Sequence, residues 1–294
     1  MKFLSFLALC FISFFSSANS DWIKFEIING KMVVPIKVEG QNVKAILDTS
    51  GEGHYISESF AKLGKLDARK TSPVIVEDNI SEVYKPLYQQ VGINVFGFDI
   101  TLDEMQLAVL PEAEVKLGAG FFFNFVYQFD YPNKRLRLLD RKSVNLKKVK
   151  NIEMRAHRQT GLPIVKVGIN NKEDAWFAMG TGLTEGLRIT RSHAKSLGLT
   201  EQEVSKVEVA DLNALREYDQ VNLPEIKFGP FSLSNVKTIF YKDDTRYELY
   251  DNRARTGSRV KGVMVKGALG YDVLQHFVIT VDFKNGYMHV GTSA

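Results

Sequence analysis

The sequence predicts a mainly β protein built from two similar lobes in tandem. Short runs of alternating β-branched and aromatic residues, broken by Gly, Asn and Pro, are typical of strands, and long helical patterns are few. A set of segments also recurs in the same order in both halves. With 294 residues, 45% apolar and 24% charged, the chain has the composition of a globular protein and enough length for a core in each half.

The N-terminus predicts export. Residues 1–20 contain a basic tip, an apolar run at Phe3–Phe15 and a small-residue end, which together are typical of a signal peptide. The run is short for a membrane span, so we expect cleavage before Asp21, a secreted or periplasmic location and no stable membrane span afterwards; an uncleaved anchor is the alternative. Cleavage removes Cys10, the only cysteine, so the mature chain can form no disulfide.

The charge of the chain points to no particular partner. The net charge of +4 is too small to predict binding to nucleic acid or to an acidic membrane. A basic run, Asp140–Asn151, is interpreted as a solvated linker. It divides the predicted N-terminal lobe, 21–146, from the predicted C-terminal lobe, 147–294.

The internal repeat is the strongest signal in the sequence. Its matching elements are Pro35–Val38 with Pro163–Val167, Leu47–Ser50 with Met179–Gly182, Val91–Gly97 with Leu223–Gly229, and Phe125–Asp130 with Phe277–Asp282. Four matches in one order are not expected by chance. The spacing is longer in the second copy, which predicts an insertion at about residues 242–261.

The turn at the centre of each copy carries the candidate chemistry. Asp48-Thr49-Ser50-Gly51 follows an apolar strand and holds a carboxylate on a tight turn. Taken alone, such a sequence is usually an ordinary turn. Its counterpart in the second copy is Gly180-Thr181-Gly182, which keeps the small residues and lacks the acid.

These features resemble the retropepsin-like aspartic peptidases, and the two-lobed arrangement is similar to the exported bacterial members of that group. The resemblance rests on the Asp48 turn, the hairpin region after it and the closing motif Gly267–Leu274. It implies two β-barrel lobes with short helices and an active-site cleft between them. It also implies an endopeptidase in which two carboxylates share a proton and activate water. Such an enzyme takes an extended peptide or unfolded protein as substrate and uses no cofactor and no metal.

The resemblance also assigns roles to single residues. Asp48 is the first catalytic carboxylate, and the catalytic loops are formed by Thr49, Ser50, Gly51, Gly180, Thr181 and Gly182. Gly180 stands where the second Asp is expected. Because a positioned acid or base contributes about 10²- to 10⁴-fold, we expect activity that is impaired or that needs a homodimer with one Asp48 from each copy.

Several alternatives stay open. An inactive pseudoenzyme could bind an extended peptide by strand addition. A nucleotide loop at 180–186 is disfavoured, because its spacing has one residue too many and the repeat already explains it. Glu185 could replace the missing carboxylate. Tyr84 and Tyr88 are predicted to belong to a substrate flap, with ordinary strand packing as the alternative. His54 could line the cleft or lie at the surface.

Overall fold

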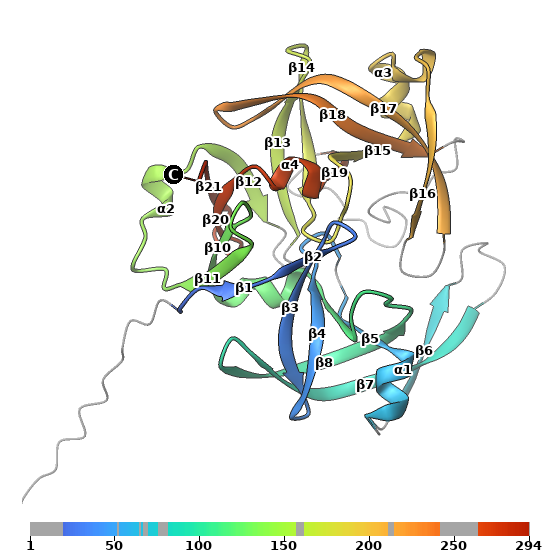
Figure 1. The fold of residues 1–294 in the computed structure, drawn as a ribbon, viewed down its shortest axis with the longest axis vertical. Helices are drawn as coiled ribbons and strands as arrows, with labels where there is room; N and C mark the ends of the chain where they lie inside the picture. Colours follow the sequence, from blue (N-terminus) through green and yellow to red (C-terminus); the bar gives the residue numbers. More distant parts are fainter. Residues whose placement is uncertain are drawn as a thin grey trace, which may run out of the picture.

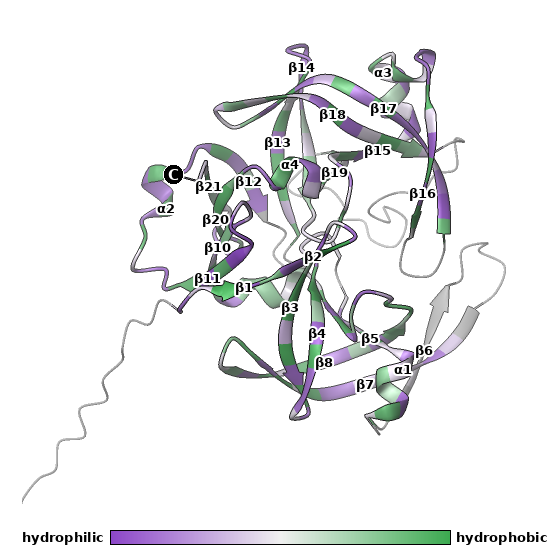
Figure 2. Ribbon diagram, viewed as in Figure 1, coloured by the Kyte–Doolittle hydropathy of each residue, from purple (hydrophilic) through white to green (hydrophobic). Residues whose placement is uncertain are grey.

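A computed structural model describes residues 20–51, 53–64, 66, 70–75, 82–156, 162–210, 215–241 and 264–293 of the protein. Most of these residues lie in strands, so the predicted mainly β fold is confirmed. Ser20 is the only described residue of the predicted signal peptide, and the predicted insertion at 242–261 lies outside the described residues. Hydrophilic and hydrophobic residues are mixed along most strands, as expected for strands with one buried face (Figure 2).

The first half of the chain forms a sheet that has eight strands within the described residues (Figure 1). In order across the sheet they are β2 (Glu26–Ile28), β3 (Lys31–Val38), β4 (Gln41–Leu47), β9 (Val115–Leu117), β5 (Tyr55–Ser57), β8 (Phe98–Ala108), β7 (Glu82–Val95) and β6 (Lys70–Ile75). Helix α1 (Glu58–Leu63) begins directly after β5, where the Ser57 hydroxyl accepts a hydrogen bond from the Phe60 amide.

A second, larger sheet holds strands from both halves, thirteen of them in the part of the chain that is described. In order they are β1 (Ile23–Lys24), β11 (Arg135–Leu139), β10 (Val126–Asp130), β20 (Val278–Asp282), β21 (Tyr287–Gly291), β12 (Ile152–Ala156), β13 (Pro163–Ile169), β14 (Glu173–Met179), β19 (Val265–Leu269), β15 (Leu187–Ile189), β18 (Phe231–Tyr241), β17 (Leu215–Phe228) and β16 (Ser205–Ala210). The short helices are η1 (Ala119–Asn124), α2 (Leu146–Val149), α3 (Arg191–Ser196), η2 (Leu199–Glu201) and α4 (Tyr271–Leu274).

The repeat predicted from the sequence is confirmed by the strand pairing. Strand β4 runs parallel to β9 in the first copy, and β14 runs parallel to β19 in the second. The residue after each central strand makes the same bond: the Asp48 amide donates to the Leu117 carbonyl at 2.9 Å, and the Gly180 amide donates to the Leu269 carbonyl at 2.8 Å. Asp48 and Gly180 are therefore equivalent positions.

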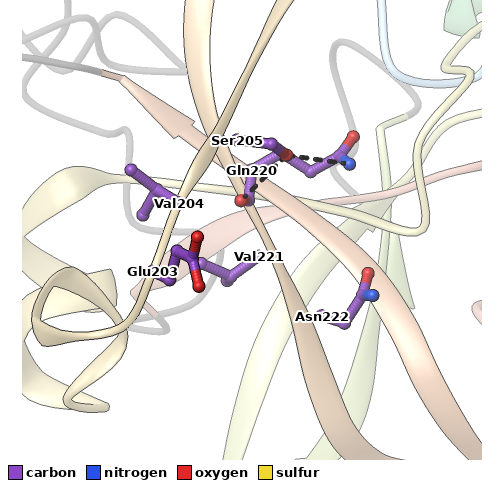
Figure 3. A pocket seen from close by; sticks show the side chains of 6 residues that line it. All are labelled: Glu203, Val204, Ser205, Gln220, Val221 and Asn222. Carbon is purple, nitrogen blue, oxygen red and sulfur yellow. Dashed lines mark hydrogen bonds between the residues drawn. The ribbon is translucent and has the colours of Figure 1, made fainter.

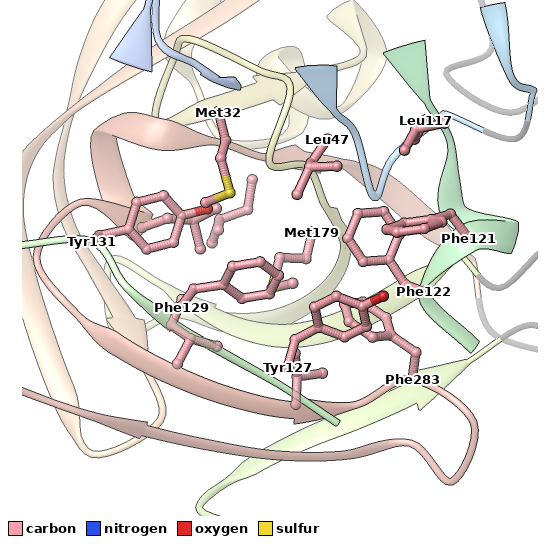
Figure 4. Packing of buried hydrophobic residues seen from close by; sticks show 14 of the residues in the cluster. Met32, Leu47, Leu117, Phe121, Phe122, Tyr127, Phe129, Tyr131, Met179 and Phe283 are labelled. Atoms are coloured by element: carbon pink, nitrogen blue, oxygen red, sulfur yellow. The ribbon is translucent and has the colours of Figure 1, made fainter. Parts of the chain in front are cut away.

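The closing strands of the two copies join the halves. Strands β10 and β20 pair antiparallel, with Phe129 opposite Ile279. One face of this pair is packed with aromatic rings, and Figure 4 shows Tyr127, Phe129, Phe122 and Phe283 together. The Phe122 and Phe283 ring centroids lie 5.2 Å apart, across the two halves. The boundary between residues 146 and 147 stays a prediction, but the two copies share one core.

The basic run between the copies is part of the fold. Asn145 caps α2 by accepting a hydrogen bond from the Lys148 amide. Leu146 is buried against Val126 and Leu139 of the shared sheet. Leu146 thus anchors this run on the sheet, whereas Lys142, Ser143, Asn145 and residues 147–150 are exposed, so the interpretation as a solvated linker holds for most of its residues.

Candidate functional site

The two central turns meet and lock together through their threonines. The Thr49 amide donates to the Thr181 hydroxyl at 3.1 Å, and the Thr181 amide donates to the Thr49 hydroxyl at 3.2 Å. Each hydroxyl also donates at 2.5 Å to a carbonyl of the other copy, Thr49 to Met179 and Thr181 to Leu47. Both threonines are buried. This reciprocal set of bonds fixes the turns face to face.

Asp48 lies in this buried interface and is fully engaged. The residue is 3% exposed in a site that also holds Lys116 of β9. Its Oδ1 accepts hydrogen bonds from the Ser50 amide at 2.9 Å and the Ser50 hydroxyl at 2.7 Å. Its Oδ2 forms an ion pair with Lys116 Nζ at 2.5 Å, and that ammonium also lies 5.8 Å from the centre of the Tyr55 ring. Asp48 therefore has a countercharge within its own lobe.

The ion pair sets the protonation state of Asp48. Burial alone would raise the pKa of this carboxyl, but the Lys116 ammonium and the two Ser50 donors together hold its pKa below the ordinary value of 3.8. The carboxyl is thus ionised at neutral and mildly acidic pH. A carboxylate that is stabilised in this way is a poor base, because bonds to its oxygens lower its affinity for a proton.

A side chain at Gly180, the position equivalent to Asp48, would have to displace the side chains that now lie beside it. A Cβ atom at Gly180 would lie 2.6 Å from Leu183 Cδ1 and 2.9 Å from the Ser50 hydroxyl. A Cβ atom at Gly182 would lie 2.6 Å from Asp48 Cγ. The equivalent of Leu183 in the first copy is Gly51. The first turn therefore has its large side chain at the first position, Asp48, and the second turn has its large side chain at the fourth position, Leu183. Leu183 fills the space beside the missing acid.

Comparison with known proteins identifies the type of lobe. Residues 165–273 match the family model described as aspartyl protease. The second lobe is retropepsin-like. This confirms the resemblance seen in the sequence, and the pairing of the strands extends the same element order to the first lobe. No curated protein matches the chain.

The retropepsin-like turns contain all the predicted loop residues, although their catalytic roles stay predictions. Glu185 does not join them. It is 6% exposed, accepts a hydrogen bond from the Thr184 hydroxyl at 2.9 Å and forms an ion pair with Arg188. Both of its oxygens are engaged within the second lobe, which disfavours the interpretation that Glu185 replaces the missing acid.

The two tyrosines of the predicted flap differ in their surroundings. Tyr88 is 7% exposed and belongs to the hydrophobic core, which favours strand packing for this residue. Tyr84 is 64% exposed on β7. Residues 76–81 and 211–214 lie outside the described residues, so the flap and the cleft beneath it stay predictions.

His54 contacts the backbone of the segment that binds Asp48. Its Nδ1 accepts a hydrogen bond from the Gly118 amide at 3.2 Å, next to the Leu117 carbonyl that binds Asp48. Burial lowers the pKa of His54 from its ordinary value of 6.5. The folded protein therefore favours the neutral ring, whose Nδ1 is free to accept.

The titration of His54 predicts a loss of stability in acid. A group whose pKa is lower in the folded state contributes stability above its ordinary pKa, here 6.5, and loses it as the pH falls through the folded pKa. His54→Asn keeps an acceptor and does not titrate, so we expect its free energy of unfolding to fall less steeply below that pH. Urea unfolding at a series of pH values measures this, with exposed His276→Asn as the control. Parallel curves for wild type and His54→Asn would contradict the assignment.

Sequence reasoning missed Lys116 and Leu183. Lys116 lies in the strand Val115–Leu117, opposite Ile46 of β4, where the second copy has Ala268 opposite Ala178. In the sequence, the only indication of a role for Lys116 was its place between Val115 and Leu117 in a short apolar strand. Comparison of the copies at this position, and of Gly51 with Leu183, would have found both.

Three further observations concern ligands and membranes. Glu203, Val204, Ser205, Gln220, Val221 and Asn222 line an open pocket of about 270 Å³ beside β16 and β17, with none of the turn residues among them (Figure 3). Among the described residues, no group of three or more His, Cys, Asp or Glu side chains could hold a metal ion. In the same part of the chain, no helix is both long and apolar enough to cross a membrane.

Proposed function

We propose that the protein binds an extended peptide or unfolded segment between its two lobes without cleaving it. The observation that carries this proposal is the Asp48–Lys116 ion pair, at 2.5 Å, in the place where an aspartic peptidase has its dyad. We further propose a secreted or periplasmic location, on the basis of the predicted signal peptide 1–20.

The chemistry of the pair supports binding over catalysis. In an aspartic dyad two carboxyls share one proton, so that one accepts a proton from water and the other donates one to the carbonyl oxygen. Here the neighbour of Asp48 is an ammonium group, and the Asp48 oxygens already accept bonds from Ser50 and Lys116. Neither step has a suitable group available.

The sheets offer places where a peptide could add as a strand. Among the described residues, strand β6 lies at one edge of the first sheet and β16 lies at one edge of the second. Figure 1 draws both on the same side of the molecule. The free backbone groups of an outer strand can pair with an extended peptide, a mode of recognition that needs no catalytic group.

An impaired aspartic endopeptidase is the second candidate, favoured by the family match of residues 165–273 and by the interlocked turns. Its dimeric form is less well supported. Asp48 is adjacent to Thr49, which is bonded to Thr181 of the same chain. A second copy could bring its own Asp48 close only if this interlock were broken.

Incubation with carboxymethylated casein from acidic to neutral pH distinguishes the two candidates. We expect no cleavage by wild type, but saturable binding of fluorescein-labelled carboxymethylated casein in an anisotropy titration. Asp48→Asn should bind with similar affinity, because Asp48 is buried. Cleavage by wild type that is lost in Asp48→Asn would support the endopeptidase and overturn the proposal. Absence of both cleavage and binding would reject both candidates.

A further inference from the structure

The positive charge of the chain is concentrated in one segment. Residues 134–150 contain eight Lys or Arg residues and one Asp, a local excess larger than the net charge of +4 for all 294 residues. The remainder of the chain is therefore net acidic. Such an asymmetry creates a local field that the overall net charge conceals.

Two of these cations, Arg135 and Arg137, lie on β11 at the outer face of the shared sheet. Leu136 and Leu138 are buried on the core face, and Arg135 and Arg137 alternate with them on the other. Lys24 of β1 lies directly opposite Arg135 and is exposed. The Trp22 ring centre lies 4.3 Å from the Arg135 guanidinium carbon and 4.5 Å from that of Arg137, so an aromatic ring is stacked on the same face.

Helix α2 extends this face. Leu146 packs on Val126 and Leu139, which are two residues along their strands from Gln128 and Arg137 and therefore share the outer face with them. The other residues of the helix and the residue after it, Lys147, Lys148, Val149 and Lys150, are exposed. Val149 is 47% exposed between two lysines.

Five cations of this surface lack a carboxylate partner among the described residues. They are Lys24, Arg137, Lys147, Lys148 and Lys150, which we call the basic face. Arg135 and Arg141 differ, since they form ion pairs with Asp130 and Asp282. Arg137 donates to the neutral Gln128 side chain, and Lys150 lies 5.2 Å from the centre of the Tyr287 ring. The positive charge of the basic face is therefore not neutralised within this part of the protein.

We infer that the basic face docks on a lipid bilayer that contains anionic phospholipids. Each Lys or Arg near an anionic bilayer contributes favourably, and aromatic side chains prefer the headgroup level. Trp22 and exposed Val149 supply the apolar contacts that such a surface accepts.

Vesicle sedimentation tests the inference with the chain from Ser20 onward, which contains every described residue. We expect it to bind vesicles of phosphatidylglycerol and phosphatidylcholine and to bind pure phosphatidylcholine much more weakly. The triple variant Lys147→Gln, Lys148→Gln, Lys150→Gln should partition about 100-fold more weakly into the anionic vesicles. The control variant Lys172→Gln, Lys195→Gln, Lys227→Gln removes the same charge from exposed positions elsewhere and should keep its binding.

The possible outcomes distinguish vesicle binding by the basic face from vesicle binding that depends only on the net charge of the protein. Equal losses in the two triple variants would overturn the inference, because net charge alone would then explain the binding. Equal binding to both kinds of vesicle would also overturn it, as would binding to heparin or nucleic acid without binding to anionic vesicles. The inference does not depend on the proposed peptide binding, since casein binding by the Lys147, Lys148 and Lys150 variant should equal that of wild type.

Discussion

A chain carrying Gly180→Asp, Leu183→Gly and Lys116→Ala is expected to cleave unfolded proteins at acidic pH, whereas Gly180→Asp alone is not. Each change copies the equivalent position of the other lobe: Asp48 for 180, Gly51 for 183 and Ala268 for 116. We expect no cleavage by Gly180→Asp alone, because the Cβ atom at position 180 would lie 2.6 Å from Leu183 Cδ1 and because Lys116 remains paired with Asp48. The triple variant removes both obstacles, and the Ser50 hydroxyl, 2.9 Å from the same Cβ position, is the end of a short side chain that can rotate.

The expected gain is large. A positioned acid or base contributes about 10²- to 10⁴-fold, so the triple variant should exceed wild type by at least the lower figure. Two facing carboxyls also titrate as a pair, which predicts a bell-shaped pH profile in acid. Release of fluorescent fragments from labelled casein measures the rate, after circular dichroism has established that each variant is folded.

Two controls make this result decisive. Asp48→Asn in the triple background should abolish the gained activity, because the rebuilt dyad needs both carboxyls. If Gly180→Asp alone reaches the rate of the triple variant, neither Leu183 nor Lys116 obstructs catalysis. A folded triple variant without activity would show that the loss of the dyad is not confined to these three positions.

The sequence predicted those parts of the site that depend on local pattern. Asp48 and Gly180 were placed at equivalent turns because each follows an apolar strand and precedes a Thr, and both features are visible in a few consecutive residues. The interlock of Thr49 and Thr181 requires only that the two turns meet. A sequence repeat is sufficient to suggest that they do.

The parts that were not predicted depend on contacts between distant strands. Lys116 reaches Asp48 because β9 lies beside β4, although the two residues are 68 positions apart in the chain. The role of Leu183 became visible only when its side chain was found beside the position of a Cβ at Gly180. The net charge of +4 for the whole chain gave no sign of the basic face, because acidic residues elsewhere offset its charge. The strand alternation of β11, which places Arg135 and Arg137 on the face opposite Leu136 and Leu138, is known only from the structure.

Lys116→Met is expected to lower the free energy of unfolding by about 3–5 kcal/mol at neutral pH, because it leaves a buried carboxylate without its countercharge. Asp48 and Lys116 side chains are 5% and 13% exposed. Neutralising both groups in Lys116→Met/Asp48→Asn should recover most of the loss, and the double-mutant cycle gives the coupling energy. Urea unfolding measures all four proteins. The exposed pair of Lys44 and Glu26 is the matched control, and Lys44→Met should cost no more than about 1 kcal/mol.

The pH dependence of the Lys116→Met defect identifies its cause. In wild type the lowered pKa of Asp48 contributes stability above the ordinary value of 3.8, and this is lost as the pH falls through the folded pKa. Without Lys116, burial is the largest influence and raises the pKa of Asp48, so the carboxyl takes up a proton while the protein is still folded. The gap in stability between wild type and variant should therefore be widest at neutral pH and should narrow in acid. A gap that is independent of pH would mean that lost packing, rather than the unpaired charge, destabilises the variant.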